Sequence, residues 1–294
     1  MSLEQYREIT FKKKTLLQID RINAIIEEYL DAGYTLTVRQ LYYQLVARDI
    51  IPNNEKSYKQ TTSIVNDARI AGLIDWDAIE DRTRSFEQRS RWTCPQDILR
   101  ASAEQYHTDP WETQGSRVFL VVEKEALVGV FQRVCREYDV PLLAARGYPS
   151  ASVVREFAQK EIEFNNGSKD VVVLHFGDHD PSGIDMTRDL RERFEMFGLG
   201  GDFTLKRMAL NIDQVEELKP PPNPAKTTDA RFVNYRKRFG PSSWELDALP
   251  PQVLSDMARD EILAHIEPKS WEKWKKGVDA ARKKMLKFAE QFEA

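Results

Sequence analysis

Three carboxylates follow two apolar segments whose composition is typical of buried strands. Glu123 comes directly after RVFLVV, residues 117–122, and Asp178 and Asp180 follow VVVLHF, residues 171–176. If the two strands are neighbours in a parallel sheet, their carboxyl ends meet at one edge, and the three side chains converge there. Clustered carboxylates repel one another unless a cation neutralises them or some of them take up protons.

Carboxylate oxygens with room for water suit Mg²⁺ or Mn²⁺, and either ion can stabilise charge on a reacting phosphodiester. Each acid also has a plainer explanation. Asp180 precedes Pro181 and could cap a helix. Glu123 could complement a helix dipole, and Asp178 could lie in a surface turn. A receiver-type phosphoacceptor domain or a nucleotide-binding sheet also places acids at strand ends, so the pattern alone does not select the reaction.

A pair of tyrosines lies in VRQLYYQLVARD, residues 38–49, which we expect to form a helix capped by Thr37. One face of this helix carries apolar side chains at helical spacing, namely Val38, Leu41, Tyr42 and Leu45. Tyr43 falls outside that face, on the side of Arg39 one turn earlier. We therefore predict a buried Tyr42 and an exposed Tyr43 phenol beside a guanidinium, where it could be activated or meet a phosphate. The alternative is a Tyr43 that only packs, half-buried.

The fold class predicted by these patterns is α/β plus α. Helices are expected over 11–31 and 55–71, on either side of the tyrosine helix, and Leu73 and Ile74 could start a short strand. Three helices running into a strand is the order of a winged helix-turn-helix, so residues 1–79 are predicted to be a winged-helix DNA-binding domain. A small helical bundle without a nucleic-acid partner is the alternative.

The rest of the chain divides into three predicted regions. Residues 80–115 are polar and are predicted to be an irregular linker, whose arginines beside Trp92 could grip a DNA backbone or only face solvent. Strands and helices alternate over 116–218, which predicts a mostly parallel sheet flanked by helices. A proline-rich loop and two helices are expected in the extension 219–294. The candidate DNA contacts are Lys56, Lys59, Arg69, Arg82, Arg84 and Lys124.

Three motifs together resemble a known family. VVEKEALVGVFQRV, ARGYPS and GDHDPSGIDM are similar to the TOPRIM domain of the topoisomerase VI A subunit and of the meiotic double-strand-break protein of eukaryotes. The resemblance covers residues 117–197, and SWELDALPP, residues 243–251, resembles a segment downstream of that domain. It implies that Glu123, Asp178 and Asp180 bind Mg²⁺.

The same resemblance extends to the tyrosine helix and implies a mechanism. Tyr43 would be a nucleophile that forms a covalent link to DNA, with Arg39 steadying the phosphate and Glu123 contributing to catalysis. The family implies a homodimer in which the tyrosine of one subunit faces the metal site of the other. It also implies double-stranded DNA as substrate and a separate ATPase subunit, since this chain has no GxxxxGK[ST] loop.

The motifs and the resemblance leave three functions open: a topoisomerase-like enzyme, a metal-dependent nuclease that uses water, and a DNA-binding regulator with an inactive TOPRIM site. The net charge of −4 among 294 residues gives no support for nucleic-acid binding, so any such surface must be local. No apolar run approaches the roughly 18 residues of a membrane span. Cys94 and Cys135 form no CxxC pair, and no secretory signal is seen. We expect a cytoplasmic, nucleoid-associated protein without a membrane partner.

Overall fold

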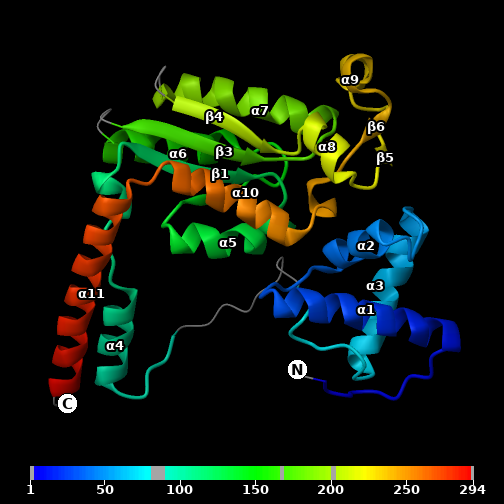
Figure 1. The fold of residues 1–294 in the computed structure, drawn as a ribbon, viewed down its shortest axis with the longest axis horizontal. Coiled ribbons are helices and arrows are strands. Elements are labelled where there is room, and N and C mark those ends of the chain that lie inside the picture. The colour runs from blue at the N-terminus through cyan, green and yellow to red at the C-terminus, as the bar shows by residue number, and fades with distance from the viewer. Residues whose placement is uncertain (1–2, 81–89, 166–168, 200–202, 293–294) are drawn as a thin grey trace.

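A four-stranded parallel sheet lies at the centre of the computed structural model, which describes residues 3–80, 90–165, 169–199 and 203–292 (Figure 1). The strands are β1 (Ser116–Val122), β2 (Leu142–Ala144), β3 (Asp170–Phe176) and β4 (Phe203–Ala209), in the order β2-β1-β3-β4. All three pairings are parallel. β1 and β3, whose apolar runs predicted burial on both faces, are indeed the two central strands.

Helices cover both faces of this sheet, as the alternating pattern predicted. On one face lie α5 (Val128–Glu137), which follows the short turn η2 (Glu125–Leu127), and α10 (Pro251–Ala264). On the other lie α6 (Ala151–Asn165) and α7 (Pro181–Phe194). The buried side chains of α10 belong to the same hydrophobic core as those of β1 and β3, so the C-terminal part of the chain completes the sheet layer.

The N-terminal unit consists of three helices, α1 (Lys13–Asp31), α2 (Val38–Ala47) and α3 (Glu55–Ile70), around a core of their own. The predicted cap is confirmed: the Thr37 hydroxyl accepts a hydrogen bond from the Gln40 amide, and the Gln40 side chain accepts one from the Thr37 amide. The short strand predicted at Leu73 and Ile74 is wrong. Here Ile74 is fully buried, and the Asp75 carboxylate accepts a hydrogen bond from the Asp77 amide, which favours a turn over a strand.

A helical arm extends from the other side of the body (Figure 1). It pairs α4 (Pro95–Gln105) with α11 (Pro268–Gln291), and the turn η1 (Pro110–Thr113) joins α4 to the sheet. The irregular structure predicted for 80–115 is therefore wrong over 95–105. Ala103 is the residue of α4 that is buried, so the helix owes its place to packing on α11 rather than to a strong apolar pattern of its own.

Short elements connect the sheet to α10. They are η3 (Glu195–Leu199), α8 (Ile212–Leu218), β5 (Asn223–Pro224), α9 (Phe232–Phe239), β6 (Ser242–Ser243) and η4 (Leu246–Ala248). β5 and β6 pair antiparallel and bring the end of the predicted proline-rich loop beside the start of the SWELDALPP segment. No helix among the described residues is long and apolar enough to cross a membrane.

Candidate active site

The acids predicted to converge lie at the carboxyl edge of adjacent strands. β1 and β3 pair in register as far as Val122 and Phe176, so Glu123 and the turn that begins at Gly177 leave the sheet side by side. Glu123 Oε2 accepts a hydrogen bond of 2.9 Å from the Asp178 amide. The side chain of Glu123 therefore holds the backbone of the turn that carries the other two acids.

Asp180 caps α7, as its position before Pro181 suggested. Its Oδ1 accepts hydrogen bonds from the Gly183 amide at 2.6 Å and from the Ser182 hydroxyl at 3.0 Å. A Cβ atom on Gly183 would lie 2.3 Å from the Asp178 carbonyl oxygen, which explains glycine at this position of the turn. Capping occupies one oxygen of Asp180 and leaves the other for a ligand.

Arg207, on β4, also holds this turn in place. The sequence analysis did not identify it. Its guanidinium donates hydrogen bonds to the carbonyl oxygens of Gly177 at 3.0 Å, Asp178 at 2.6 Å and Gly183 at 2.9 Å. It also donates to the Thr187 hydroxyl and the Leu210 carbonyl. Burial lowers the Arg207 pKa to about 10, against the pull of the nearby acids.

Two further acids complete what we call the acidic cluster: Glu123, Asp178, Asp180, Glu245 and Asp247. Glu245 and Asp247 come from the SWELDALPP segment, which reaches the site because the Leu246 amide donates to Asp178 Oδ1 at 2.8 Å. The Lys124 ammonium lies among them, 2.9 Å from Asp178 Oδ1 and 3.0 Å from Asp247 Oδ1, and is also paired with Glu245. Lys124 thus serves as an internal counter-ion.

The cluster shows the electrostatics of crowded, buried carboxylates. Burial raises the pKa of Asp178 to about 7, and the neighbouring acids add to this, while Lys124 opposes it. Burial also raises the pKa of Glu123. For Glu245, Lys124 and Arg39 outweigh burial and hold its pKa below the usual value. The site therefore carries more carboxylates than its own cations neutralise, a condition that favours binding of a further cation or a proton.

A magnesium ion fits the donor atoms of this cluster. Glu123, Asp178 and Asp180 each keep one carboxylate oxygen outside the hydrogen bonds formed with other described residues. Within the described part of the chain, no three acidic, histidine or cysteine side chains are already arranged around one point as ligands. Mg²⁺ usually keeps several of its waters, so some of these carboxylates can hold the ion through a water molecule rather than directly.

A cavity of about 760 Å³ brings the tyrosine helix and the acids together within one chain. Its lining includes Arg39, Tyr43, Asp178, Asp180 and Glu245. The Arg39 guanidinium lies 2.8 Å from Asp247 and also pairs with Glu245, so it fastens α2 to the acidic cluster. The centre of the Tyr43 ring is 5.8 Å from the same guanidinium, which confirms that the two side chains lie together.

The predicted exposure of Tyr43 is wrong, because its side chain is only 4% exposed, like that of Tyr42. The Tyr43 ring packs with Tyr42 and Val46 against Ala248 of η4, on a side of α2 that we expected to face solvent. Asn223 donates to the Tyr43 hydroxyl at 3.4 Å. Burial raises the Tyr43 pKa to about 12, and Glu245 and Asp247 add to this against Arg39.

The predicted DNA contacts have different surroundings. Lys56 and Lys59 are exposed on the first turns of α3, and Lys59 forms an ion pair of 2.7 Å with Glu55. Arg69 and Lys124 instead contact other groups within the chain. The Arg69 guanidinium stacks over the Trp76 ring at 4.5 Å and donates to its carbonyl oxygen, so it ties α3 to the segment that follows. The Lys124 ammonium is enclosed by carboxylates. Arg82 and Arg84 lie outside the described residues.

His179, the middle residue of Asp-x-Asp, points away from the acids. It is 1% exposed, its Nδ1 is 2.7 Å from the Tyr235 hydroxyl, and its ring packs edge-on against Phe239 and Trp244. Main-chain hydrogen bonds in both directions join His179 to Trp244. The histidine thus anchors the SWELDALPP segment, which places Glu245 and Asp247. The only sequence signal for that role was the resemblance of the segment itself.

Comparison with known proteins leaves the family open. A scan against protein-family models, a search of curated proteins and a search of solved structures each found no match. The function must therefore be argued from the geometry of the site.

Proposed function

We propose that this chain is a divalent-metal-dependent enzyme that cleaves DNA strands, with Tyr43 as the attacking group. The observation that carries the proposal is the single cavity shared by Tyr43, Arg39, Asp178 and Asp180. A nucleophile, a guanidinium and carboxylates with oxygens to spare are the groups that phosphodiester transesterification uses. DNA as the substrate comes from the resemblance of the three motifs described above.

The proposed reaction exchanges one phosphoester for another. The Tyr43 oxygen loses its proton and attacks phosphorus, the bond to the sugar oxygen breaks, and that oxygen takes up a proton. The product is a phosphotyrosine link to one DNA end and a free hydroxyl on the other. A divalent ion held by Glu123, Asp178 and Asp180 would supply positive charge to the phosphate oxygens. Arg39 lowers the cost of the tyrosinate beside it.

Hydrolysis is the second candidate, and the burial of Tyr43 favours it. A phenol with a pKa of about 12 is almost entirely protonated near neutral pH, so water becomes the competing nucleophile. The same carboxylates and ion would serve both reactions. Tyr43 would then act only in packing α2 against η4. The two candidates differ in one product, since only transesterification leaves protein joined to DNA.

Stopping the reaction with denaturant separates these candidates. End-labelled supercoiled and linear DNA is incubated with the full chain and Mg²⁺ or Mn²⁺, and protein-linked and free cut DNA are measured. Tyr43→Phe and Asp178→Ala are compared with Tyr42→Phe, a matched control in the same cavity whose hydroxyl is bound to Asn53 and the Asn54 carbonyl. The proposal expects protein-linked DNA that Tyr43→Phe and Asp178→Ala abolish and Tyr42→Phe retains.

Other outcomes are equally informative. Free cut DNA that Asp178→Ala abolishes and Tyr43→Phe retains would establish the nuclease and exclude tyrosine attack. Absence of any cutting by the chain on its own, or with a purified ATPase-type partner, would refute strand cleavage and leave a DNA-binding regulator. A homodimer and a separate ATPase subunit are proposed from the resemblance only.

A further inference from the structure

The outer face of α11 carries a row of lysines. At 3.6 residues per turn, one sector of this helix spans about 100°. Its side chains are those of Lys269, Lys273, Lys276, Lys283, Lys284 and Lys287, together with the uncharged Ala280 and Gln291. All six lysines are exposed. The opposite side of the helix holds its buried residues, Val278 and Ala289, and packs on α4. We call the six lysines the lysine row.

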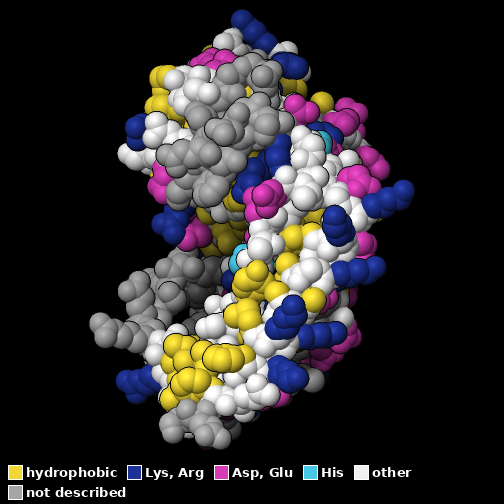
Figure 2. Space-filling view, turned by 90° about the vertical axis from the view of Figure 1, so that its left-hand side faces the viewer, with side chains coloured by type: hydrophobic (Ala, Val, Ile, Leu, Met, Phe, Trp, Pro, Cys, Tyr) yellow, Lys and Arg dark blue, Asp and Glu magenta, His cyan; other side chains and the backbone are white. Residues whose placement is uncertain are grey.

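The position of the row makes it accessible. The arm stands away from the sheet and from the N-terminal unit (Figure 1), and Figure 2 shows basic side chains projecting along it beside an apolar tip. The arm is also well fixed: the Trp274 indole donates to the Thr108 carbonyl at 3.0 Å, and the Arg282 guanidinium donates to the Tyr106 carbonyl at 2.7 Å. The lysine row is therefore a rigid surface.

Acidic neighbours on α11 explain only part of this row. Glu272 lies four residues before Lys276 and Asp279 four residues before Lys283, but no acid lies three or four residues from Lys273 or Lys284. None of the six lysines forms an ion pair with a residue that the structure describes. Lys269 with Lys273, and Lys283 with Lys287, are like charges four residues apart, an arrangement that destabilises a helix. Lys269 also lies in the first turn, where the helix dipole disfavours a cation, and no basic residue lies in the last turn. A helix selected only for stability would place these charges differently.

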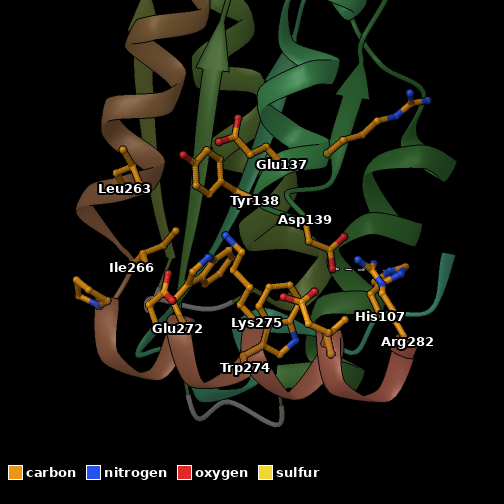
Figure 3. A pocket seen from close by; sticks show the side chains of 15 residues that line it. His107, Glu137, Tyr138, Asp139, Leu263, Ile266, Glu272, Trp274, Lys275 and Arg282 are labelled. Carbon is orange, nitrogen blue, oxygen red and sulfur yellow. Dashed lines mark ion pairs between the residues drawn. The ribbon is translucent and has the colours of Figure 1, made fainter. Parts of the chain in front are cut away.

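The groove on the adjoining side of α11 provides a contrast. This cavity of about 720 Å³ lies between α11 and the ends of α5 and α10, and acids and bases alternate on its walls (Figure 3). Lys275 and Arg282 are accompanied there by Glu272 and Asp279, and His107 lies 4.0 Å from Asp139. Acids outnumber bases in the groove lining, whereas the lysine row itself contains no acid. The row is therefore the part of α11 suited to a polyanion.

We infer that the lysine row binds the phosphate backbone of double-stranded DNA, on a segment separate from the one at the acidic cluster. From Lys269 to Lys287 the helix rises about 27 Å, at about 1.5 Å per residue. That length matches roughly eight base pairs of one strand, so several lysines can meet phosphates at once. The choice of DNA over another polyanion rests on the function proposed above. Backbone contacts of this kind carry no sequence preference.

Binding without cleavage tests the inference independently of the proposed activity. The full chain is titrated with a fluorescent duplex in EDTA, and anisotropy is measured over a range of salt concentrations. Lys273→Gln, Lys276→Gln and Lys283→Gln are combined in one variant. The matched control combines Lys12→Gln, Lys13→Gln and Lys14→Gln, three exposed lysines at the start of α1 with the same change in charge. A third variant replaces the three α11 lysines with arginine. Circular dichroism confirms that all of them fold.

The inference expects the α11 glutamine variant to bind about tenfold or more weakly, with the slope of log K against log salt reduced by roughly 2.7, as three lost phosphate contacts require. The arginine variant should bind like the unchanged chain, and the α1 variant should lose much less. Equal losses in the α11 and α1 variants, or no loss in the α11 variant, would overturn the inference. So would binding of the unchanged chain to phosphatidylserine vesicles but not to the duplex.

The two proposals can fail separately. If the α11 variant binds DNA normally while the unchanged chain cleaves it, the inference about α11 is wrong and the proposed function stands. If the α11 variant loses DNA binding but the unchanged chain cleaves DNA with neither Mg²⁺ nor Mn²⁺, the inference about α11 stands and the proposed function is wrong.

Discussion

At the scale of single residues, the acidic cluster depends on Lys124 for its charge balance. The ammonium is within ion-pair distance of Asp178, Glu245 and Asp247, and its side chain is 18% exposed. Those acids hold the Lys124 pKa above its ordinary value although burial acts in the opposite direction. Removing one partner of a buried ion cluster leaves uncompensated charge, which is more costly than never having formed the cluster.

We predict that Lys124→Met destabilises the protein by about 3–5 kcal/mol near pH 7.5. The loss should shrink as pH falls, because Asp178 and its neighbours can take up protons in place of the missing ammonium. Urea unfolding at pH 7.5 and pH 5.5 measures both effects. Lys59→Met is the control, since that lysine is exposed and forms an ion pair on the surface with Glu55. A loss that does not depend on pH would contradict this account of the cluster.

His175 gives the stability of the sheet a dependence on pH. The residue is fully buried in β3, as expected from its place in the strand, and its Nδ1 lies 2.9 Å from the Thr187 hydroxyl. Burial, with help from the Arg207 charge, lowers its pKa to about 3. The unfolded chain binds this proton near pH 6.5. Stability is therefore lost as pH falls from about 6.5 towards 3, by up to roughly 1.4 kcal/mol per pH unit.

The prediction is tested against His175→Asn, which cannot titrate in this range. The variant should be less stable than the unchanged chain at pH 7, and the gap should narrow as pH falls to 4. Comparing the two cancels the effect of the carboxylates, which both proteins share. Urea unfolding at steps of half a pH unit gives the two curves. Parallel curves would mean that His175 does not carry the pH dependence.

At the scale of elements, β4 organises the loop between β3 and α7. Five hydrogen bonds from Arg207 hold residues 177–183, Thr187 and Leu210 in place. We predict that Arg207→Met lowers the melting temperature and abolishes DNA cleavage, and that Arg207→Lys restores little, because an ammonium cannot reproduce the planar fork. Arg191→Met is the control, since Arg191 donates one bond to the Leu205 carbonyl of the same strand. Full cleavage by Arg207→Met would show that the loop holds its shape unaided.

The elements also show how far the sequence predicts this structure. β1, β3 and the helix caps at Thr37 and Asp180 were predicted because local apolar runs and hydrogen-bonding side chains determine them. α4 was missed because its stability comes from α11, more than 160 positions along the chain at the closest ends. The periodicity of a short segment cannot identify a packing partner that lies so far away in the sequence.

Only some residues of the site were predicted correctly from the sequence. Glu123, Asp178 and Asp180 stood out because each follows an apolar strand. Arg207 did not, because a single arginine in a strand has no distinctive spacing, and its five acceptors are mostly main-chain oxygens. The exposure of Tyr43 was mistaken for a related reason: the periodicity of α2 identifies the face that meets α1 and α3, but not the face that meets η4.

At the scale of the whole molecule, the N-terminal unit is joined to the sheet layer through the site itself. Arg39 pairs with Glu245 and Asp247, and Asn53 donates to the Pro222 carbonyl and to the Asn223 side chain. Polar and charged contacts dominate this junction, with the tyrosine rings and Ala248 as its apolar part. The junction sets the distance between the tyrosine and the carboxylates, so the proposed reaction depends on how the N-terminal unit packs against the sheet layer.

This junction leads to a prediction about how sites are shared between subunits. The resemblance implies that the tyrosine of one subunit serves the acids of another, whereas in this chain Tyr43, Asp178 and Asp180 line one cavity. We predict that a mixture of Tyr43→Phe and Asp178→Asn, unfolded and refolded together so that any subunits exchange, does not cleave DNA. If sites form within one chain, every site in the mixture lacks one residue. If they form between chains, mixed dimers contain one intact site and nick one strand. Recovery of nicking in the mixture would therefore require Tyr43 to leave its packing against Ala248 and Arg39 to release Glu245 and Asp247 whenever two chains meet on DNA.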